Sequence, residues 1–275
     1  MSTTAGAYDA RRAAAYWSGE RHHLGDELAS VLSLGEPPAV NQAYDAWETG
    51  LVLRTLGEGA GRLGLDVGTG VGRVAIRLAP KLGRVACVDL APGMLERLRA
   101  NAARAGVGNA DPLRSRSDSL PFATASFDAA VCLGLLEHLP RPVQSATLAE
   151  IARVLRPGGL FWLVLNNPES ILLADTADNP YRDGLQRESG YYCSVVSEPA
   201  LLEEAAAFFR IENLGSNLIY SLQRHAARRL SDSARRDPRL APFFAHAAEW
   251  DLALRPIGTM ARAAADHHLY GLVRR

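Results

Sequence analysis

The spacing of hydrophobic positions changes near residue 60 of this 275-residue chain. Residues 7–57 carry alanine-rich helical patterns, which Gly35-Glu36-Pro37-Pro38 interrupts. From residue 63 onward, short apolar runs alternate with helical patterns, an alternation typical of βαβ units and a parallel sheet. The strands expected from these runs are 63–67, 84–89, 112–117, 127–134, 160–165, 210–214 and 268–273. The pattern therefore predicts an α/β protein with one core and helical additions.

Helical patterns fill most of the remaining chain after residue 70. They cover 71–81, 92–105, 142–155, 197–209, 217–231 and 239–264. Pro157-Gly158-Gly159 is expected to end the third of these helices, because proline cannot continue a helix and glycine accepts a positive φ angle. Ser197 is expected to cap the start of the fourth, with Pro199 in its first turn.

Charge and composition limit the function classes. The chain has 30 basic and 30 acidic residues, so it lacks the overall basic field that favours binding to nucleic acids or membrane surfaces. Its 48% hydrophobic content suffices for a core. The strongest apolar run, 160–165, is too short to span a bilayer, and the N-terminus has no uninterrupted signal-peptide core. These features predict a soluble, cytoplasmic protein.

The cysteines and most histidines favour structural roles. Cys87, Cys132 and Cys193 cannot form a closed set of disulfides, so reduced thiols are expected. His22-His23 and His267-His268 are adjacent pairs, and neighbouring side chains cannot both face one side of a helix or strand. No histidine spacing resembles a metal site, so no metal is predicted.

A glycine-rich loop, Asp66-Val67-Gly68-Thr69-Gly70-Val71-Gly72, joins an expected strand to an expected helix. Glycine permits a tight turn and close approach of a ligand to the backbone. A dinucleotide fingerprint G-x-G-x-x-G would require glycine at position 73, where this chain has Arg73. The carboxylate of Asp66 would repel a pyrophosphate but suits a cationic ligand such as a sulfonium or an ammonium group.

Two further acids follow the next two expected strands. Asp89 ends the second strand, where a carboxylate can accept hydrogen bonds from both ribose hydroxyls. Enzymes that use NAD share this feature, so Asp89 alone does not identify the cofactor. The alternative role for Asp89 is to cap the helix that starts near Pro92. Asp118 follows the third strand and can accept a bond from an adenine amino group, with a plain loop residue as the alternative. Together the acids indicate a nucleoside ligand.

Four segments of the chain resemble the class I S-adenosylmethionine-dependent methyltransferases, especially the branch that acts on small metabolites, quinones and natural products. They are LDVGTGVGRVA at 65–75, VDLAPGML at 88–95, SDSLPFATASFDAAVCLGLLEHL at 117–139 and RVLRPGGLFWLVL at 153–165. Similarity runs from about residue 63 to 165, with looser similarity at 192–210 and the last strand. Departures are mild: Thr69 and Val71 replace residues that are often cysteine and threonine. The resemblance implies a Rossmann-like, seven-stranded, mostly parallel sheet whose last strand is antiparallel.

The resemblance also implies roles in binding the methyl donor, S-adenosylmethionine. The loop Gly68-Thr69-Gly70 would hold the methionine part, with Asp66 near its ammonium group, and Asp89 would take the ribose. The remaining expected contacts lie around adenine and beneath the donor: Leu90 and Met94 flanking adenine, Asp118 and the Ser119 backbone at its edge, and Leu133 below.

Catalysis of methyl transfer needs mainly in-line positioning of a nucleophile and exclusion of water, because the sulfonium already activates the methyl group. A base helps where the acceptor is a hydroxyl or a protonated amine. The pair Glu137-His138 follows the fourth expected strand, and His138 is the base candidate because of its place and its titration range. The alternative is that neither Glu137 nor His138 takes part in proton transfer.

The acceptor is expected to be a small molecule, with methylation of oxygen, nitrogen or carbon left open. Residues 1–57 are predicted as a helical cap over the active site and 58–275 as the core. Insertions at 166–196 and 215–264 are predicted to form the acceptor pocket. Seven aromatic residues in the insertions line this pocket or pack helices against the core: Tyr181, Tyr191, Tyr192, Tyr220, Phe243, Phe244 and Trp250.

Alternative functions stay open from sequence alone. Asn166-Asn167-Pro168-Glu169 and Asn179-Pro180-Tyr181 resemble fragments of DNA amino-methyltransferase motifs, but both lack the second proline and follow the fifth strand. No nucleic-acid substrate and no membrane partner are therefore expected. An NAD-dependent oxidoreductase and a catalytically silent S-adenosylmethionine-binding protein are the competing classes. The chain is expected to be a monomer or homodimer.

Overall fold

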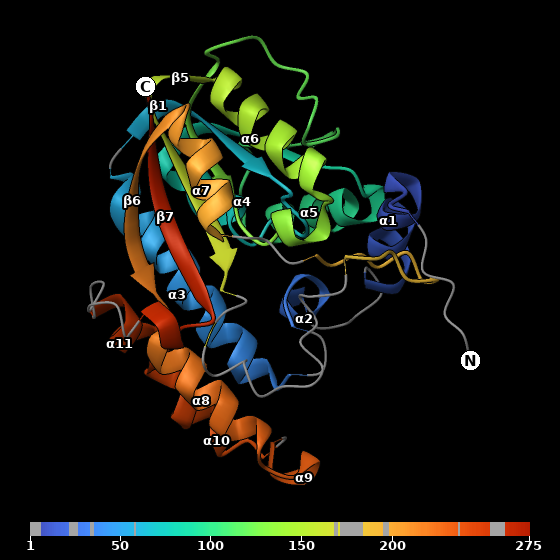
Figure 1. The fold of residues 1–275 in the computed structure, drawn as a ribbon, viewed down its shortest axis with the longest axis vertical. Coiled ribbons are helices and arrows are strands. Elements are labelled where there is room, and N and C mark those ends of the chain that lie inside the picture. The colour runs from blue at the N-terminus through green and yellow to red at the C-terminus, as the bar shows by residue number, and fades with distance from the viewer. Residues whose placement is uncertain are drawn as a thin grey trace.

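The sheet at the centre of the protein has the predicted topology. The computed structural model describes residues 7–21, 27–33, 36–57, 59–167, 170, 184–194, 198–235, 237–253 and 262–275. The described residues form one seven-stranded sheet in the order β3-β2-β1-β4-β5-β7-β6 (Figure 1). Its strands are β1 Gly59–Val67, β2 Leu82–Asp89, β3 Ala110–Arg114, β4 Phe127–Cys132, β5 Leu155–Asn166, β6 Phe209–Ser216 and β7 His267–Arg274. Strands β1 to β5 pair in parallel, and β7 runs antiparallel to β5 and β6. The Rossmann-like sheet with an antiparallel last strand is confirmed.

The strand order reverses direction at β1. Along the chain the sheet first grows from β1 through β2 to β3, and then from the other side of β1 through β4 and β5. Ligands of open α/β sheets bind outside the carboxyl ends of the strands at such a switch point. Asp66 lies there, level with Cys87 of β2 and Val131 of β4.

Helices cover both faces of the sheet. The helices before β2 are α1 Ala10–Tyr16, α2 Glu27–Val31, α3 Pro38–Leu56 and α4 Ala75–Leu78. Those from β2 to β6 are α5 Pro92–Arg104, α6 Arg141–Val154 and α7 Glu198–Ala206, and those after β6 are α8 Leu218–Arg228, α9 Asp232–Arg235, α10 Leu240–Ala245 and α11 Ala247–Ala253. In Figure 1, α8, α9 and α10 extend from one end of the sheet, while α1 and α2 lie on the side away from β6. Among the described residues, no helix combines the length and apolar character that crossing a membrane requires.

Alternation along the strands divides the core into two layers. In β4, Ala129 and Val131 face the layer that contains α3, α4, α8, α10 and α11, whereas Ala130 and Cys132 face α6 and α7. This alternation follows from the two-residue period of a strand. The three cysteines are buried and make no disulfide, as expected from the sequence.

Several element boundaries differ from the sequence expectation, among them β3, which spans Ala110–Arg114 instead of 112–117, and β5, which starts at Leu155 instead of residue 160. The helix expected over 142–155 ends at Val154, before Pro157-Gly158-Gly159, because Leu155 already pairs with Phe127 of β4. The helix expected from residue 71 starts at Ala75, since Gly72 has a φ of +82°. The helix expected over 239–264 is divided between α10 and α11, and residues 254–261 lie outside the described residues, as does Ser197.

Helix α3 belongs to the core rather than to a separate cap. Trp47 and Val52 are fully buried and lie in the same hydrophobic cluster as the sheet residues Val131 and Val164. Burial of such side chains stabilises a fold by about 1.5–3 kcal/mol each. The predicted segment 1–57 therefore combines a core helix with shorter elements that lie at the carboxyl edge of the sheet.

Candidate functional site

The glycine loop after β1 adopts the backbone conformation that its sequence predicts. Gly68, Gly70 and Gly72 have φ angles of +77°, +54° and +82°, values that favour glycine. A Cβ atom on Gly68 would lie 2.9 Å from the Leu135 Cβ, and one on Gly70 would lie 2.8 Å from the Val31 Cγ1. The loop is thus held between the loop after β4 and helix α2, without room for side chains.

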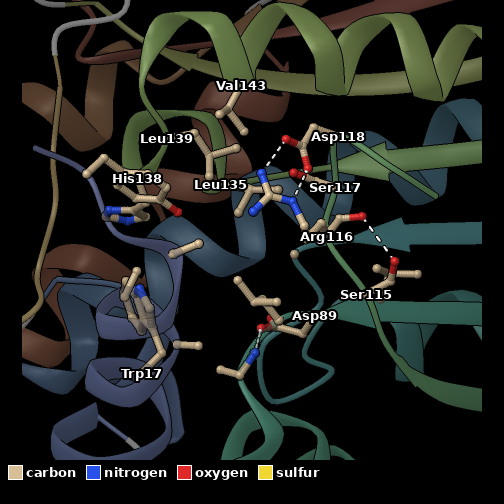
Figure 2. Close-up of a pocket in the computed structure, with 18 residues that line it drawn as sticks. Trp17, Asp89, Ser115, Arg116, Ser117, Asp118, Leu135, His138, Leu139 and Val143 are labelled. Atoms are coloured by element: carbon tan, nitrogen blue, oxygen red, sulfur yellow. Dashed lines mark hydrogen bonds and ion pairs between the residues drawn. The ribbon is translucent and has the colours of Figure 1, made fainter.

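Asp89 ties this loop to the end of β2. Its carboxylate accepts a hydrogen bond from the backbone N–H of Ala91 at 2.9 Å (Figure 2) and another from the backbone N–H of Gly70 at 2.9 Å. Burial raises the pKa of Asp89 above its usual range, against the opposing effect of these bonds. The bond to Ala91 closes a local turn ahead of α5, whose N-cap is Ala91 without a side-chain bond, so Asp89 is not the helix cap that was the alternative. The bond to Gly70 fixes the glycine loop. Asp89 therefore has a structural role in addition to any contact with a ligand.

Replacing Asp89 with alanine is expected to weaken donor binding by about 1–3 kcal/mol, because charge-assisted hydrogen bonds are lost. Isothermal titration calorimetry with S-adenosylhomocysteine measures the change. The matched control is Asp111→Ala, since Asp111 is an exposed acid on β3 that pairs with Arg84. Unchanged affinity in a folded Asp89→Ala variant would remove Asp89 from the donor site.

Asp66 is buried at the end of β1. Its side chain accepts a hydrogen bond from the Thr69 hydroxyl at 2.9 Å, and the residue is 4% exposed. Burial raises the pKa of Asp66 to about 6, while the Thr69 bond and the positive charge of Arg73 oppose this rise. A cationic group placed beside this buried carboxyl group would favour its charged form and lower its pKa.

Two adjoining cavities bring the predicted donor residues together. One contains Asp66, Gly68, Thr69, Gly70, Asp89, Met94 and Leu133 in its lining. The other, shown in Figure 2, contains Gly68, Asp89, Leu90 and Asp118. The Ser119 side chain and backbone do not line either cavity; the Ser119 carbonyl accepts a bond from the Ser115 hydroxyl at 3.2 Å. The first cavity thus combines acids with the glycine loop, and the second is mainly apolar; binding of a nucleoside there stays a prediction.

Asp118 already has a partner within the protein. Its carboxylate accepts hydrogen bonds from Arg116, at 2.8 Å from Nε (Figure 2). An adenine amino group would have to share this carboxylate with the guanidinium. The neighbouring Ser117 hydroxyl bonds to Thr147 at 2.8 Å, which fixes the loop on α6.

His138 lies where the two donor cavities meet a third, larger cavity. Its Nδ1 lies 2.9 Å from the Tyr192 carbonyl oxygen. A carbonyl only accepts hydrogen bonds, so Nδ1 carries the proton and Nε2 of the neutral ring keeps its lone pair. The rings of Trp17 and Tyr191 contact the imidazole edge-on at centroid distances of 5.0 and 5.6 Å. The predicted base therefore has the tautomer that proton acceptance needs.

The third cavity, which we term the acceptor cavity, has a volume of about 360 Å³. Its lining comes from the N-terminal elements, the loop after β4, the segment after β5 and helix α8. The lining residues are Tyr16, Trp17, Arg21, Val31, Leu32, Ser33, Glu36, Asn41, Tyr44, Gly134, Glu137, His138, Asn166, Tyr191, Tyr220, Arg224, Arg228 and His267. Glu137 and His138 both line this cavity, and their part in catalysis stays a prediction.

The predicted aromatic residues divide between the cavity and the core. Tyr191 and Tyr220 line the acceptor cavity, and Tyr192 supplies the carbonyl that holds His138. Phe244 is fully buried in the core, whereas Phe243 and Trp250 are exposed. Tyr181 lies outside the described residues.

His267 was not expected at the site but lines the acceptor cavity. Its Nδ1 accepts a hydrogen bond from the Asn217 side chain at 2.9 Å, and burial lowers its pKa to about 3. His268 bonds instead to the Ser216 hydroxyl at 2.7 Å. Adjacent strand residues point to opposite faces, so one member of the pair reaches the cavity while the other does not. The residues 22 and 23 of the other histidine pair lie outside the described residues.

Arg73 stands where a dinucleotide fingerprint would need glycine. In the structure its side chain pairs with two acids of helix α3. Its guanidinium is paired with Asp45, at 3.0 Å, and with Glu48 of α3. Asp45 also pairs with Arg77 at 2.6 Å, and the Tyr44 hydroxyl donates to Glu48 at 3.3 Å. This buried ionic cluster fixes the end of the glycine loop on α3. Within the described residues, no group of histidine, cysteine and acidic side chains is arranged to hold a metal ion.

Comparison with known proteins places these features in a family. The family described as "Methyltransferase domain" matches residues 65–159. The chain is 33% identical over 175 residues to the ubiquinone biosynthesis O-methyltransferase of Xanthomonas oryzae pv. oryzae, which covers 62% of this chain and 71% of the relative.

Solved structures agree on the fold. The [4+2]-cyclase SpnF is 22% identical, with a TM-score of 0.53, covering 86% of this chain and 82% of its own. A geranyl diphosphate methyltransferase in complex with S-adenosylmethionine is 16% identical, with a TM-score of 0.55, covering 83% and 84%. At these identities the two likenesses show the fold alone.

Proposed function

Because the chain belongs to the class I S-adenosylmethionine-dependent methyltransferases, we propose that it methylates a hydroxyl group of a small molecule bound in the acceptor cavity. The observation that carries this proposal is the place of His138, at the junction of the two donor cavities and the acceptor cavity. The relative from Xanthomonas oryzae is named as an O-methyltransferase, which supports oxygen as the methylated atom. Family membership removes the NAD-dependent oxidoreductase from the alternatives.

The donor is assigned to the two smaller cavities. The loop Gly68-Thr69-Gly70 would hold its methionine part, with Asp66 beside the ammonium group. Asp89 would bind the ribose, and Leu90 and Met94 would flank adenine, for which Asp118 supplies an edge contact. These assignments rest on residues that line the same cavities. The donor supplies an activated methyl group, and the protein supplies orientation and exclusion of water.

His138 would accept the proton of the acceptor hydroxyl at Nε2. The Tyr192 carbonyl holds the Nδ1–H and keeps the ring in this tautomer. Loss of the proton makes the oxygen a stronger nucleophile toward the methyl group. Glu137, which lines the same cavity, stabilises the imidazolium that this transfer forms, because opposite charges attract across a partly enclosed site.

Incubation of the protein with S-adenosylmethionine and a panel of phenols, alcohols and amines tests the proposed function. Mass spectrometry should detect S-adenosylhomocysteine together with an O-methylated product. Methylated amines without methylated hydroxyls would overturn the choice of oxygen. Donor binding without any methylated product over the whole panel would favour a catalytically silent binding protein.

Donor binding is expected to weaken as the pH falls below about 6. The pKa of Asp66 is raised to about 6 by burial, so its carboxyl group binds a proton in acid and must lose it to pair with the donor ammonium group. The Kd of S-adenosylhomocysteine should rise about tenfold between pH 7 and pH 5, by calorimetry. Asp66→Asn should remove most of this dependence. An equally steep dependence in that variant would contradict the assignment of Asp66 to the ammonium group.

A further inference from the structure

The charged side chains of the acceptor cavity are mostly cationic. Three arginines line it, namely Arg21, Arg224 and Arg228, against two carboxylates, Glu36 and Glu137. Burial keeps His267 neutral by lowering its pKa to about 3. Behind the lining, the buried Asp266 offsets part of the charge of Arg224, so the pairing of each arginine matters more than the sum of charges.

Arg21 is the buried cation of this set without a carboxylate partner. It ends the π-helical turn Trp17–Arg21 and is 5% exposed. Its Nε donates to the Ser30 carbonyl at 3.0 Å and its Nη2 to the Leu32 carbonyl at 2.6 Å. Among the described residues, no carboxylate lies within ion-pairing distance of it. Carbonyl oxygens carry only partial charge, so the buried guanidinium keeps a strong preference for an anion.

The geometry directs this guanidinium toward the cavity. Two of its nitrogens hold the chain that leads toward α3, and the guanidinium lies 5.2 Å from the centroid of the Trp17 ring. Trp17 also contacts the ring of His138. The π-helical turn therefore presents a cation and an aromatic wall on the same side as the proposed base. Such turns are frequent at functional sites.

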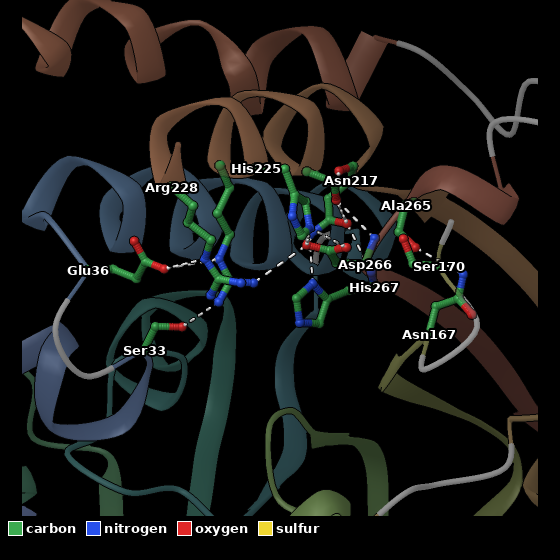
Figure 3. A network of polar contacts seen from close by, with 12 residues as sticks. Ser33, Glu36, Asn167, Ser170, Asn217, His225, Arg228, Ala265, Asp266 and His267 are labelled. Carbon is green, nitrogen blue, oxygen red and sulfur yellow. Dashed lines mark hydrogen bonds and ion pairs between the residues drawn. The ribbon is translucent and has the colours of Figure 1, made fainter. Parts of the chain in front are cut away.

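Arg228 supplies a second donor group to the cavity lining, from helix α8. Its Nε donates to Glu36 at 2.9 Å (Figure 3), and in the described part of the chain its Nη nitrogens have no hydrogen-bond partner. The neighbouring Arg224 is balanced by Glu36 and by the buried Asp266, each at 3.5 Å. Glu36 thus pairs with both arginines of α8. Arg21 has no such carboxylate and is available to bind an anionic group of a ligand.

We propose that the methyl acceptor carries an anionic oxygen group, a carboxylate or a phosphate, and that Arg21 binds this group with support from Arg228. This inference rests on the proposed function, because it assigns the acceptor to this cavity. The guanidinium group offers paired N–H donors that match the oxygens of such anions. The aromatic rings of Trp17, Tyr44 and Tyr191 favour a planar body between the anionic group and His138.

Calorimetric titration of the protein, saturated with S-adenosylhomocysteine, tests the inference with benzoate, phenyl phosphate and benzamide. At least one of the two anions should bind ten times more tightly than benzamide, and the stronger of the two identifies the anionic group. Arg21→Met should abolish the preference and Arg228→Met should reduce it. Arg11→Met is the matched control, since Arg11 is exposed on α1 and does not line the cavity.

Arg21→Lys keeps the positive charge and covers the case in which Arg21→Met fails to fold. It should retain part of the preference for the anion. Equal binding of benzamide and both anions to the unaltered protein, or an unchanged preference in Arg21→Met, would overturn the inference. Failure of the protein to bind S-adenosylhomocysteine would instead overturn the proposed function, so the two failures are distinguishable.

Discussion

Replacing Arg73 with methionine is expected to lower the free energy of unfolding by about 3–5 kcal/mol, the typical cost of breaking a buried ion pair from one side. The Arg73 side chain is 9% exposed, and its partners Asp45 and Glu48 are 3% and 0% exposed. Arg77 still pairs with Asp45 in the variant. Glu48 keeps only the Tyr44 hydroxyl among the partners described above. Chemical denaturation followed by circular dichroism measures the loss.

The loss should shrink in acid. Burial already raises the pKa of Glu48 above its usual range, and removal of Arg73 raises it further. The folded variant then binds more protons than the unfolded chain, so its stability recovers as the pH falls. Arg84→Met is the control, because Arg84 is an exposed partner of Asp111 and such pairs contribute about 0–1 kcal/mol. A loss no larger than that of the control would contradict the structural role of Arg73.

Replacing His138 with alanine is expected to lower kcat by about 10²–10⁴-fold, the usual contribution of a positioned base. The Kd of S-adenosylhomocysteine should change little, since proton acceptance takes place on the acceptor side. Steady-state kinetics with the best acceptor of the panel, over a range of pH, measures the effect. In this variant, the change of kcat with pH that comes from titration of the His138 imidazole should disappear.

The matched control for this prediction is His246→Ala, because His246 is an exposed histidine that pairs with Glu249. Its kcat should equal that of the unaltered enzyme. A His138→Ala variant with unchanged kcat at every pH would leave His138 as a wall of the cavity. A lower kcat accompanied by an equal loss of donor affinity would point to a positioning role instead.

The donor half of the site could be predicted from sequence because its determinants are local. Gly68 and Gly70 stand within one loop, and Asp89 closes the neighbouring strand, so strand periodicity alone brings them to one edge of the sheet. The contact of Asp118 with Arg116 is also local, but its geometry depends on side-chain rotamers that a pattern of residue types does not specify. The donor roles of these residues stay predictions until a ligand is bound.

The segments and aromatic residues of the acceptor half could be predicted in part, since Tyr191 and Tyr220 line the cavity. Its arginines and His267 could not be predicted, because they are brought together from distant segments. Arg21 and Arg228 meet one cavity although more than two hundred positions separate them. Their sequence surroundings resemble those of the other arginines of this arginine-rich chain. Likewise, His267 reaches the cavity through the register of β7 against β5, where it pairs with Asn166. Tertiary placement of strands and helices, rather than local propensity, selects these residues.

Strand β7 has a consequence for the synthesis of the protein. Among the described strands, β6 pairs with β7 alone, and β7 also covers the edge of β5. While the chain grows on the ribosome, β6 and the four helices α8 to α11 emerge before β7 does. Until then β5 presents an open edge, which can recruit strands from other chains. The sheet is therefore completed only when β7 pairs between β5 and β6, and the nascent chain exposes the edge of β5 until that step.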